Sequence, residues 1–335
     1  MSNVHDVELV DASSAGSEAP DVDLRIRVGG LHLANPVMTA SGCAAAGREL
    51  AHFFDVADLG AVVTKSVMLR PRSGRATPRM AETPAGMLNS IGLQGPGIDA
   101  FIDEDLAWLR QRGATTVVSI AGGSVEEYAL LAGRLAEADG IAAIEVNISC
   151  PNVANRGLVF ACDAFASREV IAAVVEETPP GIPVLAKLSP DVTDVVAIAK
   201  ACTDGGAQGL VAINTLLGMA IDTETMRPVL ANLTGGLSGP AVRPIAVRVI
   251  WQLHAAMRAG LLPRVPIVGV GGIRTGLDAM QLVLAGACAV QVGTATFNDP
   301  DAPVRVVAEL ARALDARGIP AFAEIVGAAH PQAVR

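Results

Sequence analysis

A thiol lies between two carboxamide side chains in segment 147–152, which reads Asn-Ile-Ser-Cys-Pro-Asn. None of these three groups is charged at neutral pH, and together they can hydrogen-bond a flat, amide-rich ligand. A thiol has an ordinary pKa of about 8.5, so a modest change of surroundings can bring it into the range of a working base. We therefore expect Cys150 to act as a base on a ligand that Asn147 and Asn152 hold.

The cysteine pattern predicts reduced thiols. Five cysteines are scattered along the chain without a C-x-x-C pair, at Cys43, Cys150, Cys162, Cys202 and Cys288. This spacing predicts a cytoplasmic protein with neither a disulfide framework nor a metal site. An isolated cysteine is normally an inert packing residue, and we expect that role for Cys43, Cys202 and Cys288. Cys162 lies in the same loop region as Cys150 and is the alternative base.

Lysine is scarce in this chain. Of 25 basic residues only Lys65, Lys187 and Lys200 are lysines. Lys65 and Lys187 each end an apolar strand-like run, where a charge is costly to bury. A lysine at a strand end usually extends its ammonium group into water. Two lysines in equivalent places instead favour a function, such as stabilising negative charge on a ligand.

The elements that must position these residues alternate from residue 36 onward. Apolar runs typical of strands are 36–39, 61–65, 116–120, 142–148, 184–188, 209–213, 267–270 and 289–292. Helix-like stretches separate them, for example 126–137, 167–177, 192–202, 243–259 and 277–285. Eight βα units with continuous apolar strands predict an α/β fold, the closed (β/α)₈ or TIM barrel. An open doubly wound sheet is the alternative, but no G-x-G-x-x-G follows the first strand.

The rest of the chain fits one large unit. Residues 1–22 are rich in Ser, Ala, Asp and Glu and predict a disordered tail. Residues 24–33 predict a β-hairpin, so we expect a single barrel domain over 23–335. The net charge of −9 and the lack of a basic cluster argue against nucleic acid. No apolar run is long enough to span a membrane.

Active sites of such barrels form where the strands end. The strand ends predicted here carry small or polar residues, and two long inserts, 66–115 and 215–242, follow them. The seventh and eighth strands end in Gly271-Gly272 and Gly293-Thr294. Glycines there let backbone N–H groups approach phosphate oxygens, so this pair predicts a phosphate-binding site. A glycine-rich turn without a ligand is the plainer interpretation of either motif alone.

Four segments together resemble the class 1 dihydroorotate dehydrogenases. They are 81–94 (Ala-Glu-Thr-Pro-Ala-Gly-Met-Leu-Asn-Ser-Ile-Gly-Leu-Gln), 147–152, 213–215 and 233–240. The resemblance runs from about residue 24 to the end of the barrel. It implies an FMN-dependent enzyme that oxidises (S)-dihydroorotate to orotate in pyrimidine (UMP) biosynthesis. The family's cysteine base implies that Cys150 takes the C5 proton of the substrate while C6 gives hydride to the flavin.

The resemblance also implies which residues bind which molecule. For the substrate they are Lys65, Asn89, Ile91, Gly92, Leu93, Asn147, Asn152, Asn214 and Thr215. For FMN they are Ala40, Ser41, Lys65, Ser66, Asn147, Lys187, Ile213, Gly239, Gly271, Gly272, Gly293 and Thr294. Lys187 would place its positive charge near flavin N1, where negative charge develops on reduction.

Segments 81–94 and 234–240 resemble subclass 1B in particular. That subclass passes electrons to NAD⁺ through a second subunit that holds FAD and a [2Fe-2S] cluster. The resemblance therefore implies a homodimer that joins such a subunit in a heterotetramer. This chain has no cysteine cluster for iron–sulfur ligation, so the cluster would lie on the partner. Fumarate, the acceptor of subclass 1A, is the alternative.

Two other functions remain as alternatives. The nearer is a dihydropyrimidine dehydrogenase or a related FMN oxidoreductase, since residues 154–162 depart from the usual Gly-rich 1B sequence. The other is a barrel that binds FMN or a phosphate ligand without catalysis. An intact Cys150, three asparagines and two lysines argue against that loss of activity.

Overall fold

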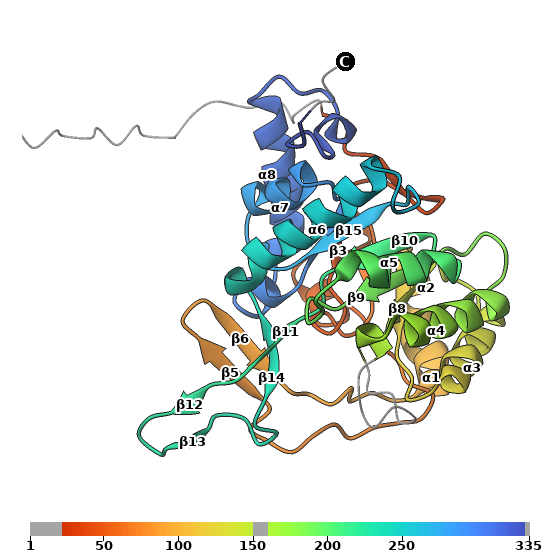
Figure 1. Cartoon of the computed structure of the whole chain (residues 1–335), viewed down its shortest axis with the longest axis vertical. Coiled ribbons are helices and arrows are strands. Elements are labelled where there is room, and N and C mark those ends of the chain that lie inside the picture. Colours follow the sequence, from red (N-terminus) through yellow and green to blue (C-terminus); the bar gives the residue numbers. More distant parts are fainter. Residues whose placement is uncertain (1–21, 150–159, 332–335) are drawn as a thin grey trace, which may run out of the picture.

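The computed structural model describes residues 22–149 and 160–331 and contains a parallel eight-stranded barrel (Figure 1). Its strands follow one another in the order β3-β16-β15-β10-β9-β8-β7-β4. The ring closes between β3 and β4, where Met38 and Ala61 form a parallel bridge. The strands are β3 Val37–Thr39, β4 Val62–Val63, β7 Thr116–Ile120, β8 Ala143–Asn147, β9 Val184–Leu188, β10 Gly209–Ala212, β15 Ile267–Val270 and β16 Ala289–Val292. The predicted TIM barrel is confirmed.

Helices cover the outside of the barrel. They are α3 Val125–Ala136, α4 Ala164–Glu177, α5 Val195–Asp204, α6 Arg243–Arg258, α7 Gly276–Leu284 and α8 Ala302–Asp315. A further helical stretch runs through α1 Ile98–Ala100, a π-helical segment Phe101–Leu106 and α2 Ala107–Gln111. Polar N-caps define several helix starts: Asp163 accepts a hydrogen bond from Ala166 N, and Asp194 accepts from Val196 N and Ala197 N. The Asp163 cap explains why α4 begins three residues before its predicted start.

The first strand departs from the predicted regular βα repeat. Only two short 3₁₀ turns, Leu50–His52 and Val56–Asp58, lie between β3 and β4. Gly42 and Gly47 in this connection have φ angles of 93° and 84°, values that a continuous right-handed helix does not contain. The barrel therefore has eight strands, but a loop with two 3₁₀ turns takes the place of the helix expected after β3.

The two long inserts pair with each other at the C-terminal end of the barrel. The first holds β5 Met80–Thr83 and β6 Gly86–Asn89, and the second holds β11 Leu216–Gly218 and β14 Gly235–Ser238. They form one antiparallel sheet in the order β11-β14-β6-β5, with Asn89 opposite Gly236 (Figure 1). A smaller ribbon, β12 Ile221–Asp222 with β13 Arg227–Pro228, extends beyond it. This pairing joins segments that lie about 150 residues apart and brings both inserts to one site.

The opposite end of the barrel is covered by the predicted hairpin. β1 Ile26–Val28 pairs antiparallel with β2 Leu31–Leu33. A side chain added at Gly29 would meet Pro183 and Gln208, which directly precede β9 and β10. The hairpin therefore packs where the strands begin. The predicted disordered tail lies outside the described residues except for Val22. Within 22–149 and 160–331 no helix is long and apolar enough to cross a membrane.

Candidate active site

The Asn147 amide connects three strands of the barrel. Its Nδ2 donates to Ser66 Oγ at 3.1 Å, and its Oδ1 accepts from Asn214 Nδ2 at 3.0 Å. Ser66 Oγ lies 2.9 Å from Ser119 Oγ at the next strand. Because both ends of the amide are engaged, its orientation is fixed by the strands themselves. The structure thus brings together Ser66, Asn147 and Asn214, all predicted as site residues.

The start of the predicted catalytic loop is anchored to this network. Ser149 N donates to Asn147 Oδ1 at 3.2 Å, and Asn214 Nδ2 donates to Ser149 Oγ at 3.0 Å. The buried Tyr128 hydroxyl donates to the Asn147 carbonyl at 2.6 Å. These bonds fix the backbone up to Ser149. Cys150 and Asn152 lie outside the described residues, so their roles stay predictions.

A third asparagine reaches the same end of the barrel from the paired inserts. Asn89 Nδ2 donates to the carbonyl of Gly236 at 3.2 Å. A Cβ added at Gly236 would lie 2.1 Å from Thr215 Oγ1, so the second insert passes directly beside Thr215. The β6–β14 pairing is what carries Asn89 to Thr215 and its neighbour Asn214. Asn89, Asn214 and Thr215 were all predicted to bind substrate.

A cavity of about 310 Å³ opens at the ends of β3, β9, β10, β15 and β16. Nine of the twelve residues predicted to bind FMN line it: Ala40, Ser41, Lys187, Ile213, Gly239, Gly271, Gly272, Gly293 and Thr294. The other three, Lys65, Ser66 and Asn147, are not among its lining residues. Asn214 and Thr215, predicted for the substrate, line the cavity as well.

Two glycines that line this cavity have no room for a side chain. Gly272 has φ +73°, and a Cβ there would lie 2.6 Å from the Cβ of Arg243. A Cβ at Gly293 would lie 2.9 Å from the Cβ of Ala40. Both distances are too short for a side chain, so the backbone itself forms the wall. A wall of exposed backbone at βα turns suits a phosphate group and a planar ring.

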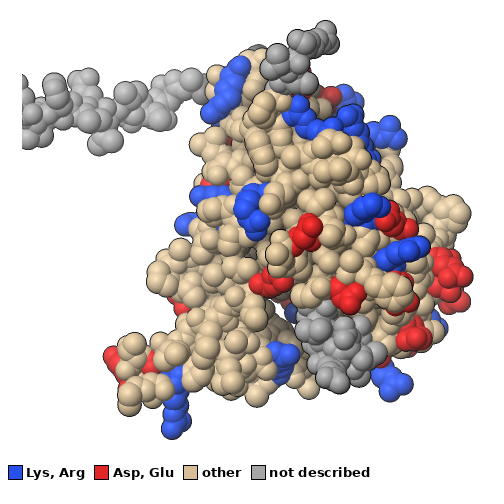
Figure 2. Space-filling view, viewed as in Figure 1, with Lys and Arg blue, Asp and Glu red and all other residues tan. Residues whose placement is uncertain are grey.

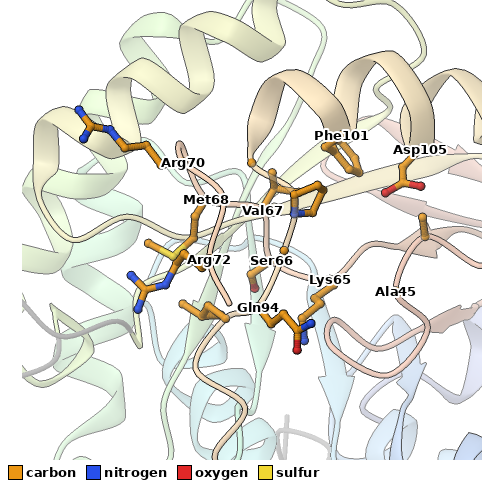
Figure 3. Close-up of a pocket in the computed structure, with 15 residues that line it drawn as sticks. Ala45, Lys65, Ser66, Val67, Met68, Arg70, Arg72, Gln94, Phe101 and Asp105 are labelled. Carbon is orange, nitrogen blue, oxygen red and sulfur yellow. The ribbon is translucent and has the colours of Figure 1, made fainter. Parts of the chain in front are cut away.

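Lys65 and Ser66 line a second cavity of about 420 Å³ (Figure 3). The first insert also lines it, through Leu93, Gln94, Phe101 and Asp105. Burial lowers the pKa of the partly buried Lys65, Cys43 counteracts this, and Arg79 adds to it. Predicted site residues therefore line both cavities.

The described cysteines Cys43 and Cys162 both have a raised pKa. Burial raises the pKa of Cys43 to about 11, although Lys187 and Lys65 act in the opposite sense. Cys162 is exposed, and its pKa is raised by burial and then by Asp191. Raised pKa values make both thiols poor bases near neutrality. Cys43 nevertheless lines the smaller cavity, which its sequence surroundings did not indicate.

A buried polar group inside the barrel was missed by sequence reasoning. Lys187 is the penultimate residue of β9, as the predicted strand 184–188 has it, but its side chain is 3% exposed and does not reach water. Its Nζ lies 3.3 Å from Glu145 Oε1 and donates to Gln291 Oε1 at 2.9 Å. The available signal was a single charged residue in the apolar strand 142–148, and a single Gln in 289–292.

Comparisons with known proteins identify the family of this chain. The family model described as dihydroorotate dehydrogenase matches residues 23–314. Proteins named dihydroorotate dehydrogenase B (NAD(+)), catalytic subunit, from Geobacter sp. (strain M21) and Citrifermentans bemidjiense are each 49% identical over 306 residues. That alignment covers 91% of this chain and 98% of each relative. The protein of the same name from Desulforudis audaxviator is 49% identical over 309 residues, covering 92% and 98%. The chain belongs to the dihydroorotate dehydrogenase family.

Proposed function

We propose that this protein oxidises (S)-dihydroorotate to orotate, in pyrimidine biosynthesis, as the catalytic subunit of a class 1B enzyme. The observation that carries the proposal is the Asn147–Asn214 hydrogen bond beside a cavity lined by Asn214, Lys187 and the start of β6, the strand that ends in Asn89. Carboxamides carry both N–H donors and C=O acceptors, which complement the ring C=O and N–H groups of a dihydropyrimidine. The matched family and the names of its relatives support the same reaction.

FMN is the cofactor that we propose for the 310 Å³ cavity. Gly271, Gly272, Gly293 and Thr294 would hold its phosphate, and Lys187 would lie at its ring. Bound there, the flavin supplies the acceptor for a hydride. The chain's own residues would have the other roles. The asparagines would orient the substrate ring, and the paired inserts would exclude water from the site. Cys150 would take the proton from C5.

The electron acceptor is proposed from the relatives. Their name contains NAD(+) and describes a catalytic subunit, which implies a separate subunit for electron transfer. We propose that this chain forms a homodimer and joins a partner carrying FAD and a [2Fe-2S] cluster. We also propose a cytoplasmic location, which its scattered cysteines favour.

Substrate choice tests the proposed reaction. Purified chain containing flavin should reduce an artificial dye with dihydroorotate and not with dihydrouracil. The carboxylate distinguishes these molecules, and Lys65 is the one cation among the proposed substrate residues. Rapid turnover of dihydrouracil without turnover of dihydroorotate would instead identify a dihydropyrimidine dehydrogenase.

Lys65→Ala should lower dihydroorotate turnover more than flavin content. Lys65 lines the 420 Å³ cavity with Leu93 and is not among the residues that line the 310 Å³ cavity. We expect kcat/KM to fall by about 10-fold to 100-fold, the loss typical of one charge-assisted hydrogen bond. Flavin content per chain and dye reduction measure the two effects. Lys200→Ala, which removes an exposed lysine paired with Asp204, is the matched control. Equal loss of flavin and turnover in Lys65→Ala would contradict this assignment.

The isolated chain should not reduce NAD⁺ with dihydroorotate. One barrel leaves no second dinucleotide domain among residues 22–149 and 160–331, so the electrons must pass to an acceptor outside this chain. Co-expression with an iron–sulfur flavoprotein subunit should confer NAD⁺ reduction. Anaerobic assays with NAD⁺ and with fumarate measure this directly. Rapid turnover with fumarate would place the protein in subclass 1A, and NAD⁺ reduction by the chain alone would refute the relay.

A further inference from the structure

Three polar side chains form a closed hydrogen-bonded triangle inside the barrel. Lys187 Nζ donates to Gln291 Oε1 at 2.9 Å and lies 3.3 Å from Glu145 Oε1. Gln291 Nε2 donates to Glu145 Oε2 at 2.7 Å. Lys187 is 3% exposed, Gln291 1% and Glu145 0%. The three residues at the corners of the triangle lie on β9, β16 and β8, so the triangle spans the barrel interior.

The triangle lies directly against the 310 Å³ cavity. Lys187 and Gln291 line this cavity, whereas Glu145 is not among its lining residues. On β8 Glu145 precedes Asn147 by two residues, so both side chains point to the barrel interior. Asn147 is the register partner of Lys187. Lys187 therefore has the cavity on one side and a carboxylate on the other.

Glu145 is the anion that faces Lys187 among the described residues. The other titratable groups near Lys187 are the Cys43 thiol and, next to that thiol, the Lys65 ammonium. Burial raises the pKa of Cys43 to about 11, so this thiol is neutral under ordinary conditions. Gln291 carries no charge. The Lys187–Glu145 pair is thus electrically neutral and is held by an amide that bonds both partners.

A buried ammonium group without a counter-ion is costly and commonly loses its proton. A buried pair retains both charges only when the geometry and the remaining hydrogen bonds are good. The triangle meets this condition, since each of its three edges is a hydrogen-bond contact. A merely structural ion pair would stabilise the fold without any need to adjoin a ligand cavity.

We propose that Glu145, oriented by Gln291, is a positioning residue that keeps Lys187 in its ammonium form whether the flavin beside it is oxidised or reduced. The inference rests on the proposed function only for the presence of flavin. In the intact protein, reduction by two electrons then takes up one proton, and Lys187 offsets the remaining negative charge. Without Glu145, Lys187 would be neutral beside oxidised flavin. The same reduction would then take up two protons, one on the flavin and one on Lys187.

Lysine NMR tests the charge state directly, because the chain contains only three lysines. Protein containing lysine with ¹³C at Cε should give three signals, assigned with Lys65→Arg and Lys200→Arg. In wild type the Lys187 signal should stay at the ammonium position between about pH 6 and 9, below the ordinary lysine pKa of about 10.4. In Glu145→Gln it should move to the neutral position within this range. A Lys187 signal that is neutral at pH 7 in wild type, or unchanged in Glu145→Gln, overturns the proposal.

One variant serves as the control. Asp204→Asn removes the partner of Lys200, an exposed pair with Nζ 2.7 Å from the carboxylate, and should leave the Lys200 signal at its ammonium position. If Glu145→Gln does not fold, Glu145→Asp and the wild-type titration still decide whether a carboxylate holds Lys187 charged.

The flavin potential gives the second readout. With one proton per two electrons the reduction equilibrium changes tenfold per pH unit, or about 30 mV. With two protons it changes a hundredfold, or about 59 mV. We expect the first slope in wild type and in Asp204→Asn, and the second in Glu145→Gln. The titration uses dithionite with redox mediators, so it does not depend on dihydroorotate. Equal slopes in wild type and Glu145→Gln overturn the inference, whereas failure to oxidise dihydroorotate contradicts only the proposed function.

Discussion

Cys150→Ala should lose about 10²-fold to 10⁴-fold in turnover while keeping its flavin, because a general base contributes about this much. The described residues that line the proposed flavin cavity lie on other strands and loops, so we expect flavin binding to persist without the thiol. Cys150→Ser should retain slight activity, mainly at high pH, since a hydroxyl is much harder to ionise than a thiol. The pH–rate profile of both variants with dye as acceptor measures the effect.

Cys162→Ala is the matched control for this prediction. Cys162 is exposed on the 3₁₀ turn Phe160–Cys162, and its Sγ lies 3.8 Å from the Asp191 carbonyl. Burial and Asp191 raise its pKa, which makes it a poorer base than an ordinary thiol. We expect Cys162→Ala to keep nearly full turnover. A crippled Cys162→Ala beside an active Cys150→Ala would reverse the assignment.

Lys187→Met should be the most damaging change to the fold of the site. It leaves the Glu145 carboxylate buried at 0% exposure with Gln291 alone as its partner in the triangle. Removing one partner of a buried ion pair typically costs about 3–5 kcal/mol of stability. The protein should also bind flavin more weakly and make it harder to reduce, because the cation at the ring is gone. Chemical denaturation, flavin content and midpoint potential measure the three effects.

The double variant Lys187→Met/Glu145→Gln separates the two consequences. Replacing both charges removes the stranded carboxylate, so most of the lost stability should return. The flavin should remain hard to reduce, because no cation is restored. A double variant as unstable as Lys187→Met would show that packing, and not the unpaired charge, causes the loss.

Strand ends were the most predictable part of this protein. Continuous apolar runs located all eight barrel strands, and the rule that barrel sites form at their carboxyl ends selected Ser66, Asn147 and Asn214. The structure joins these three by hydrogen bonds. The apolar sequence of each strand is enough to predict that strand, because no contact with a distant segment is needed to recognise it.

Contacts between distant segments were not predictable. The antiparallel pairing of β6 with β14 joins two inserts whose short strands contain several glycines and no clear alternation. The Glu145–Lys187–Gln291 triangle depends on three strands that meet only after the barrel closes. A strand-end lysine and a buried interior lysine have the same sequence context. Only the closed barrel distinguishes them, since it places Glu145 within reach of Lys187.

Anaerobic titration of the purified chain with dihydroorotate tests the proposed reaction most directly. One equivalent of dihydroorotate should bleach the visible absorption of one bound flavin and yield one equivalent of orotate, with no partner subunit and no dye present. Dihydrouracil should leave the flavin oxidised. A flavin that dihydroorotate does not bleach, in protein that dithionite still reduces, would contradict the proposed function.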